Sequence, residues 1–125
     1  MEQVGRKILI VNTQAAYAEF LKTNIETTFP AVEIAVAESG EAALELVNRS
    51  GYELVITDLM LPGMGGVNLF YELKGRYPQI RTILLSDGFD IKRMRVFEQE
   101  GLFGYVEKPF LMESLLDLIG RAIRA

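Results

Sequence analysis

The sequence predicts an α/β fold in which a doubly wound, mostly parallel sheet of five strands carries helices on both faces. Two observations lead to this prediction. Short apolar runs alternate with longer stretches of helical spacing along the whole chain. The central runs ILIV, LVI and ILL are continuously apolar, which is typical of strands buried on both faces of a parallel sheet.

The five predicted strands are the apolar runs, which lie at residues 7–12, 32–37, 53–58, 80–86 and 103–108. The first helix follows the first strand, because apolar residues recur there at every fourth position (Tyr17, Leu21, Ile25 and Phe29). The second begins after the predicted N-cap Ser39, with Glu41 in its first turn. We therefore expect helix and strand to alternate from the start of the chain.

The third and last helices show the same periodicity, at Val67, Phe70, Leu73 and Tyr77 and at Leu111, Leu115, Leu118 and Ala122. A fourth helix at about 91–100 has the weakest pattern, because IKRMRVFEQE contains few apolar residues. Pro78 and Gly101 are expected to end helices. The resulting order favours a flavodoxin-like sheet, 2-1-3-4-5, in a single domain that spans residues 1–125.

In such a sheet, ligands bind beyond the carboxyl ends of the strands. Asn12 and Thr13 follow the first predicted strand, Asp58 ends the third, Ser86 ends the fourth and Lys108 ends the fifth. The topology therefore predicts that a carboxylate, a hydroxyl and an ammonium meet at one edge of the sheet.

Composition excludes several classes of site. The chain has no cysteine and no histidine, so it holds neither a disulfide nor a thiolate or imidazole metal site, and it cannot carry a phosphohistidine. The net charge of −4 argues against nucleic acid as a partner of this domain. No apolar run approaches the length of a membrane span and the N-terminus has no signal-peptide pattern. We expect a cytoplasmic domain with no membrane partner.

Asp58 is a candidate nucleophile towards phosphorus. A carboxylate forms an aspartyl phosphate when the charge of the transferred group is neutralised. The candidates for this role are a Mg²⁺ ion, the ammonium of Lys108 and the hydroxyl of Ser86. Each residue also has an ordinary structural interpretation, as a turn residue, a backbone-bonding hydroxyl or a solvated lysine. The combination at three strand ends favours the chemical interpretation.

The segments DLMLPGMGG (58–66), LLSDG (84–88) and GYVEKPF (104–110) resemble the receiver domain of two-component response regulators. The resemblance covers essentially the whole chain. It implies that Asp58 is the phosphoacceptor for a histidine kinase or phosphotransfer protein, and that Ser86 and Lys108 contact the phosphoryl group. It also implies that Ser86 and Tyr105 form the switch, and that the domain is not an enzyme beyond its own phosphoryl transfer and autodephosphorylation.

The resemblance further implies a cis Lys108–Pro109 peptide and a metal site that includes Asp58 and the backbone carbonyl of Met60. The acidic pair that holds Mg²⁺ in this family is replaced here by Asn12 and Thr13, whose neutral oxygens are expected to be weak ligands of the ion. Losing two charges should weaken Mg²⁺ binding by several kcal/mol at an effective dielectric of about 20. This corresponds to roughly a thousandfold in affinity, so we expect weak Mg²⁺ binding and no other cofactor.

Two side chains could respond to the missing charges. Asp87 is a candidate for a compensating carboxylate, although its position favours a side chain that points to solvent. Lys108 has Asp58 as its nearest expected opposite charge, so a direct Lys108–Asp58 ion pair is predicted, which would partly mimic the neutralised state.

The glycines of PGMGGVN fit neither a dinucleotide nor a phosphate-loop spacing, and are expected to form a tight turn with close backbone packing. A flavin mononucleotide site is disfavoured because NTQAAYAEF lacks a glycine-rich loop.

The last helix carries an apolar arc of about 160°, where about 100° suffices for packing on a sheet. We expect its Met112, Leu116 and Ile123 edge to be in surplus. The fourth helix, fifth strand and last helix form the usual partner surface of the family, and their charges suit a partner or a homodimer: Lys92, Arg93, Arg95, Glu113 and Asp117.

Two functions remain open from the sequence. The domain either accepts a phosphoryl group on Asp58 with weakened Mg²⁺ binding, or acts as a pseudo-receiver that mediates protein interaction or dimerisation without phosphorylation. The retained Asp58, Ser86 and Lys108 favour the first function, and Asn12 and Thr13 favour the second.

Overall fold

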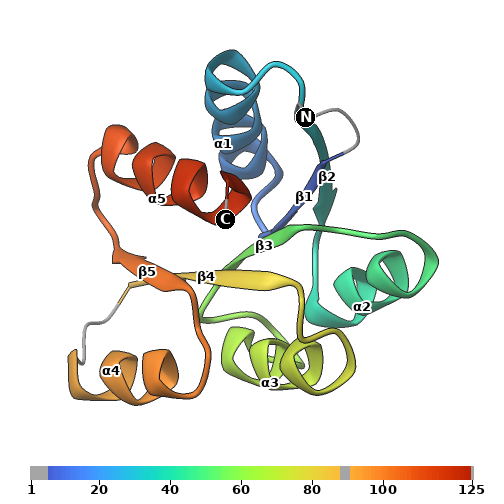
Figure 1. The fold of residues 1–125 in the computed structure, drawn as a ribbon, viewed down its shortest axis with the longest axis vertical. Helices are drawn as coiled ribbons and strands as arrows, with labels where there is room; N and C mark the ends of the chain where they lie inside the picture. The colour runs from blue at the N-terminus through green and yellow to red at the C-terminus, as the bar shows by residue number, and fades with distance from the viewer. Residues whose placement is uncertain (1–5, 88–90, 125) are drawn as a thin grey trace.

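The computed structural model describes residues 6–87 and 91–124. Five strands form one parallel sheet in the order β2-β1-β3-β4-β5, which confirms the predicted topology (Figure 1). The strands are β1 (Lys7–Val11), β2 (Glu33–Ala37), β3 (Leu54–Asp58), β4 (Arg81–Ser86) and β5 (Gly104–Glu107). Each lies within a predicted apolar run. The three central strands β1, β3 and β4 are buried along almost their whole length, as their continuous apolar runs predict.

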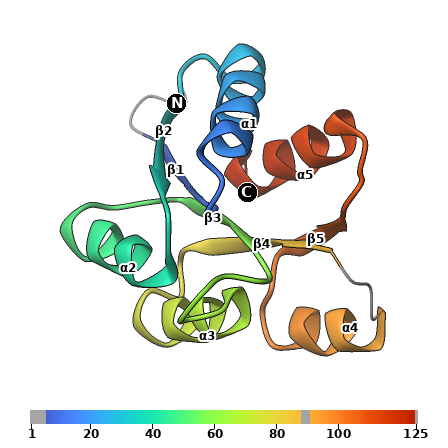
Figure 2. The same cartoon turned by 180° about the vertical axis from the view of Figure 1, so that it is seen from behind.

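The helices are α1 (Ala15–Thr28), α2 (Gly40–Arg49), α3 (Gly66–Arg76), α4 (Ile91–Gln99) and α5 (Met112–Arg124). Helices α1 and α5 cover one face of the sheet, and α2, α3 and α4 cover the other, as the two opposite views show (Figures 1 and 2). The fold is therefore doubly wound, as predicted. Gly88 of the LLSDG segment lies outside the described residues.

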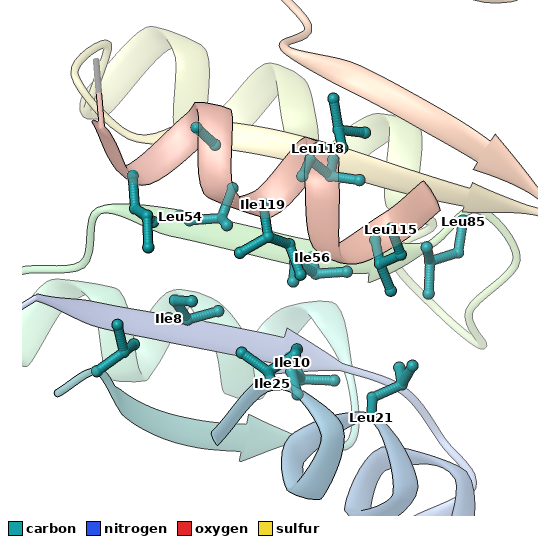
Figure 3. Close-up of a cluster of buried hydrophobic side chains, with 14 of the residues drawn as sticks. Ile8, Ile10, Leu21, Ile25, Leu54, Ile56, Leu85, Leu115, Leu118 and Ile119 are labelled. Carbon is teal, nitrogen blue, oxygen red and sulfur yellow. The ribbon is translucent and has the colours of Figure 1, made fainter. Parts of the chain in front are cut away.

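The largest core cluster lies between the sheet and the pair α1 and α5 (Figure 3). Its fully buried members come from three strands and both helices, and include Ile8, Ile10, Leu21, Ile25, Leu54, Ile56, Leu115 and Ile119. Burying one such side chain contributes about 1.5–3 kcal/mol to stability. This cluster holds β1 and β3 in register, so the strand ends that carry the polar residues have fixed positions.

The structure corrects the expectation for α5. Ile123 is fully buried, while Met112 and Leu116 are partly buried and pack against the same cluster. The supposed surplus edge is covered because α5 shares this cluster with α1 as well as with the sheet. The width of its apolar arc therefore gives no support to a partner surface.

Two local features place the loop that follows β3. The Ser39 side chain accepts a hydrogen bond from the Ala42 amide, which confirms the predicted N-cap of α2. Glu41, in the first turn of α2, accepts a hydrogen bond from the Met64 amide at 3.2 Å. Gly63 has φ +70°, a conformation that glycine adopts without strain. The turn that connects β3 to α3 is thus hydrogen-bonded to the start of helix α2.

Gly66 permits the close approach of α3 to the end of β3. A Cβ atom at this position would lie 2.1 Å from the carbonyl oxygen of Asp58. The close backbone packing predicted for the PGMGG segment is therefore confirmed.

Among the helices that the structure describes, none combines the length and the apolar character of a membrane-spanning helix.

Candidate functional site

The carboxyl ends of four strands bring the predicted polar residues to one edge of the sheet. Asp58 is the last residue of β3, and Ser86 is the last residue of β4 and fully buried. Lys108 directly follows β5, and Asn12 directly follows β1 and is 1% exposed. Parallel pairing of β1 with β3 and of β3 with β4 places these ends side by side.

An ion pair joins Asp58 and Lys108. The Lys108 Nζ atom lies 2.8 Å from Asp58 Oδ1 and 3.7 Å from the nearer oxygen of Asp87. Asp58 Oδ1 is buried and has no partner that meets hydrogen-bond geometry within the described chain, so the ammonium is its compensating charge. The direct contact predicted between Lys108 and Asp58 is present.

Asn12 holds the other oxygen of Asp58. Its Nδ2 donates to Asp58 Oδ2 at 2.9 Å, and its Oδ1 accepts a hydrogen bond from the Gln14 amide at 2.7 Å. These two contacts fix the amide orientation, because a carboxylate only accepts and a backbone N–H only donates. Asn12 therefore presents a donor, not an oxygen, to the carboxylate.

Burial and the ion pair act in opposite directions on Asp58. Burial raises the pKa of this carboxyl above its ordinary value, and the Lys108 ammonium only partly offsets that increase. Burial by itself would lower the pKa of Lys108, but the contact with Asp58 outweighs it and the pKa is raised. The lysine is therefore held in its charged form beside the carboxylate.

The donors at this edge fit a resident Mg²⁺ ion poorly. Mg²⁺ requires oxygen ligands, usually with one or two carboxylates. Asp58 already pairs with Lys108, the Asn12 oxygen is engaged by the Gln14 amide, and Thr13 and Met60 are exposed. No cluster of three or more acidic, cysteine or histidine residues suited to a metal occurs among residues 6–87 and 91–124.

The sequence allows Asp87 either to act as a compensating carboxylate or to point to solvent, and the structure shows features of both. Its side chain is 65% exposed, so it faces solvent, yet one oxygen reaches within 3.7 Å of Lys108. It adds negative charge beside the ammonium, where it contributes to the raised pKa of Lys108. Its described ion-pair contact is thus with Lys108.

The remaining predicted residues occupy the neighbouring strand. Tyr105, on β5, is partly buried and packs against the core cluster on the α3 and α4 side of the sheet, which includes Leu59 and Phe97. The Lys108–Pro109 peptide bond is cis, as expected. Ser86 and Tyr105 both make interactions with other groups.

Tyr17 also belongs to the site, although its place in the sequence does not predict this. Its ring lies over the Lys108 ammonium, 4.8 Å from Nζ to the ring centroid. Sequence periodicity assigns Tyr17 to the apolar stripe of α1, and that stripe contains no signal that one member contacts a lysine on another element. An apolar groove of about 600 Å³ adjoins it, lined by Tyr17, Phe20, Lys108, Pro109, Phe110, Leu111 and Met112.

The sequence is similar to a known protein family and to individual proteins of that family. The family model described as "Response regulator receiver domain" matches residues 8–120. The response regulator protein FleR of Pseudomonas aeruginosa is 32% identical over 118 residues, which are 94% of this chain and 24% of that protein. The response regulator receiver protein Anae109_2439 of Anaeromyxobacter is 29% identical, over 90% of this chain and 47% of that protein.

Solved structures agree with these matches. A response regulator receiver domain protein from Clostridium thermocellum is 26% identical with a TM-score of 0.80, over 94% of both chains. A signal receiver domain of an HD domain-containing protein from Pseudomonas fluorescens Pf-5 is 27% identical with a TM-score of 0.84, again over 94% of both. The chain spans about a quarter of the first curated relative above and about half of the second.

Proposed function

The chain belongs to the response regulator receiver domain family of two-component systems, and on this premise we propose that Asp58 accepts a phosphoryl group from a histidine kinase or phosphotransfer protein. The observation that carries the proposal is the position of Asp58 at the end of β3, with Lys108 Nζ at 2.8 Å. A receiver domain catalyses only its own phosphoryl transfer and hydrolysis, so we assign it no other enzymatic activity.

In the transfer step, a carboxylate oxygen of Asp58 attacks the phosphorus of a phosphohistidine on the donor protein. The new oxygen–phosphorus bond forms as the nitrogen–phosphorus bond breaks, and the electron pair of that bond returns to the donor's imidazole ring. We assign Lys108, whose Nζ lies 2.8 Å from Asp58 Oδ1, to the negative charge that develops on the phosphoryl oxygens. Ser86, buried at the end of the adjacent strand, is the hydroxyl that we assign to the opposite side of the phosphoryl group.

Mg²⁺, when bound, would neutralise charge on the phosphoryl oxygens. We propose that it binds weakly, through Asp58, the Met60 carbonyl and water, with Thr13 as a neutral candidate ligand. Asn12 serves the site by donating to Asp58. From this chain itself, Lys108 then supplies the neutralising charge and the Asn12 amide a hydrogen bond to Asp58.

The output passes through Ser86 and Tyr105 to the surface formed by α4, β5 and α5. Support for this surface comes from its exposed charges, which include Arg95 on α4 and Glu113 and Asp117 on α5. A hollow on the same face is lined by residues of all three elements, among them Glu98, Tyr105 and Arg121. A homodimer or a partner protein of complementary charge is the proposed occupant. We propose the cytoplasm as the location.

Beryllofluoride, a stable mimic of the phosphoryl group on aspartate, tests the proposal. Amide NMR spectra are recorded with beryllofluoride at rising Mg²⁺ concentrations, and Asp58→Asn is the matched control. Saturable shifts around Asp58, Ser86 and Lys108 that extend to Tyr105, and that are absent in the variant, are expected. No shifts at high millimolar Mg²⁺ would overturn phosphoacceptance.

One observation favours a second candidate, the pseudo-receiver that acts without phosphorylation. Both oxygens of Asp58 already face partners, Lys108 and Asn12, so the carboxylate is compensated before any phosphoryl group arrives. In this case beryllofluoride causes no shifts, while Asp58→Asn leaves binding to the partner or dimerisation unchanged.

A further inference from the structure

Tyr17 covers one side of the ammonium that serves Asp58. Lys108 Nζ lies 2.8 Å from Asp58 Oδ1, 3.7 Å from Asp87 and 4.8 Å from the centre of the Tyr17 ring. The Lys108 side chain is 24% exposed, and two carboxylates and an aromatic face lie against its charged end. Tyr17 is the uncharged member of this set, and an aromatic face attracts a cation through its quadrupole.

The position of Tyr17 is tied to the site by hydrogen bonds. Asn12 donates to Asp58 and accepts from the Gln14 amide, immediately before α1. Gln14 is the N-cap of α1, and its carbonyl accepts a hydrogen bond from the Ala18 amide. The residue that holds the carboxylate therefore also fixes the first turn of the helix that carries Tyr17.

The Tyr17 ring also contacts apolar side chains. Its ring contacts Phe20 at 6.3 Å between centroids, packs partly against the largest core cluster and lines the groove beside Phe110 and Leu111. Burial raises the pKa of the Tyr17 phenol, and Asp58 and Asp87 add to that increase while Lys108 opposes it. The Tyr17 ring is therefore neutral where it contacts both the Lys108 ammonium and the apolar lining of the groove.

We propose that Tyr17 is a positioning residue that holds the Lys108 ammonium against Asp58 and shields it from water. Its aromatic face, not its hydroxyl, performs this role. The ring stays beside the ammonium when Lys108 moves from the carboxylate towards a bound phosphoryl oxygen. The effect on phosphoryl binding rests on the proposed function of Asp58, whereas the effect on Lys108 does not.

The comparison of Tyr17→Phe with Tyr17→Leu separates the aromatic face from apolar bulk. The first measurement is the exchange of the Lys108 ammonium protons with water, followed by side-chain ¹⁵N NMR. We expect Tyr17→Leu to speed exchange several-fold and Tyr17→Phe to leave it within about twofold of wild type, as for a cation–π contact. Phe20→Leu, which removes another ring of the groove, should also leave it unchanged.

The second measurement is beryllofluoride affinity. Tyr17→Leu should weaken it roughly three- to thirtyfold, the range that a cation–π contact supports, while Tyr17→Phe retains it. Thermal unfolding monitors each variant, and Tyr17→Met replaces Tyr17→Leu if the latter does not fold.

The two readouts fail separately. Equal proton exchange in wild type and Tyr17→Leu, or equal acceleration in Phe20→Leu, overturns the role of Tyr17. If wild type binds no beryllofluoride, the proposed phosphoacceptance fails, and the exchange measurement still decides whether Tyr17 positions Lys108. A further outcome is that proton exchange responds to Tyr17→Leu while wild type and Tyr17→Leu bind beryllofluoride with equal affinity. That result overturns the role of Tyr17 in phosphoryl binding.

Discussion

Asn12 donates a hydrogen bond to Asp58 at the edge of the sheet, with 2.9 Å between Nδ2 and Oδ2. In the family pattern this position carries a metal-binding carboxylate, and here it carries a donor that faces the proposed phosphoacceptor. The amide cannot turn its oxygen to a cation without losing the Gln14 amide and opposing the carboxylate. The replacement therefore changes both the charge and the direction of the hydrogen bond.

Restoring the carboxylates should restore the metal site. The double variant Asn12→Asp, Thr13→Asp is expected to bind Mg²⁺ roughly a hundred- to a thousandfold more tightly, because two charges are returned to the cleft. Without Mg²⁺, Asn12→Asp should lower the free energy of unfolding by about 1–3 kcal/mol, because a buried acceptor replaces the donor to Asp58. Titration by NMR and urea denaturation measure the two effects.

Asn12→Ala is the control, since it removes the donor without adding charge. It should lose stability without gaining Mg²⁺ affinity. Equal Mg²⁺ affinity in wild type and the double variant would contradict our account of the site.

Removing the lysine should leave Asp58 without its compensating cation. Lys108→Met is expected to raise the pKa of Asp58 further, because the ammonium is the group that now lowers it. Beryllofluoride affinity should fall at least tenfold, as for a lost charge-assisted contact. Side-chain ¹³C NMR follows the carboxyl group directly.

Lys22→Met is the matched control, because Lys22 is a lysine of similar partial exposure whose ion pair, with Glu26 on α1, does not involve Asp58. At 3.9 Å this pair contributes little, and its loss should leave the pKa of Asp58 unchanged. An unchanged Asp58 pKa in Lys108→Met would contradict the ion pair.

The raised pKa of Asp58 predicts a pH dependence of stability. Above its ordinary value of 3.8 and below its value in the folded state, folded Asp58 binds more protons than unfolded Asp58. Its contribution to the free energy of unfolding is therefore greatest below pH 3.8 and is lost as the pH rises through the folded pKa. Stability of wild type minus that of Asp58→Asn should fall over this window. A difference that rises with pH would mean that the ion pair outweighs burial.

The contact between Gly66 and Asp58 predicts a steric effect. Gly66→Ala places a Cβ atom 2.1 Å from the Asp58 carbonyl oxygen, so α3 must shift. We expect a loss of about 2–4 kcal/mol in the free energy of unfolding, as for overpacking against backbone. Beryllofluoride binding should weaken as well, since the shift moves the end of β3.

Gly75→Ala in the same helix is the control. Among residues 6–87 and 91–124, no heavy atom outside its two chain neighbours and the adjoining helix backbone lies within 4 Å of its added Cβ, so this change should stabilise the protein by about 0.5–1 kcal/mol. Equal stability losses in both variants would contradict the steric explanation.

The strand order and the strand ends could be predicted because buried parallel strands leave uninterrupted apolar runs, such as residues 8–11. The covered edge of α5 could not. A helical projection shows the width of an apolar arc but not which elements share it, and here α1 packs beside α5. The contact of Tyr17 with Lys108 likewise depends on where the start of α1 meets the end of β5. The orientation of Asn12 depends on two partners that composition does not specify.

The Asn12 amide also sets what the site can sense. An uncharged group does not titrate between acid and alkaline solution, and its hydrogen bonds are hardly screened by salt. With a magnesium-binding carboxylate at position 12, the contacts of Asp58 would depend on whether the surrounding solution supplies magnesium. With an amide in that place, the hydrogen bond that Asn12 donates to Asp58 persists whether or not magnesium is bound, so this part of the resting pocket does not report on the ion.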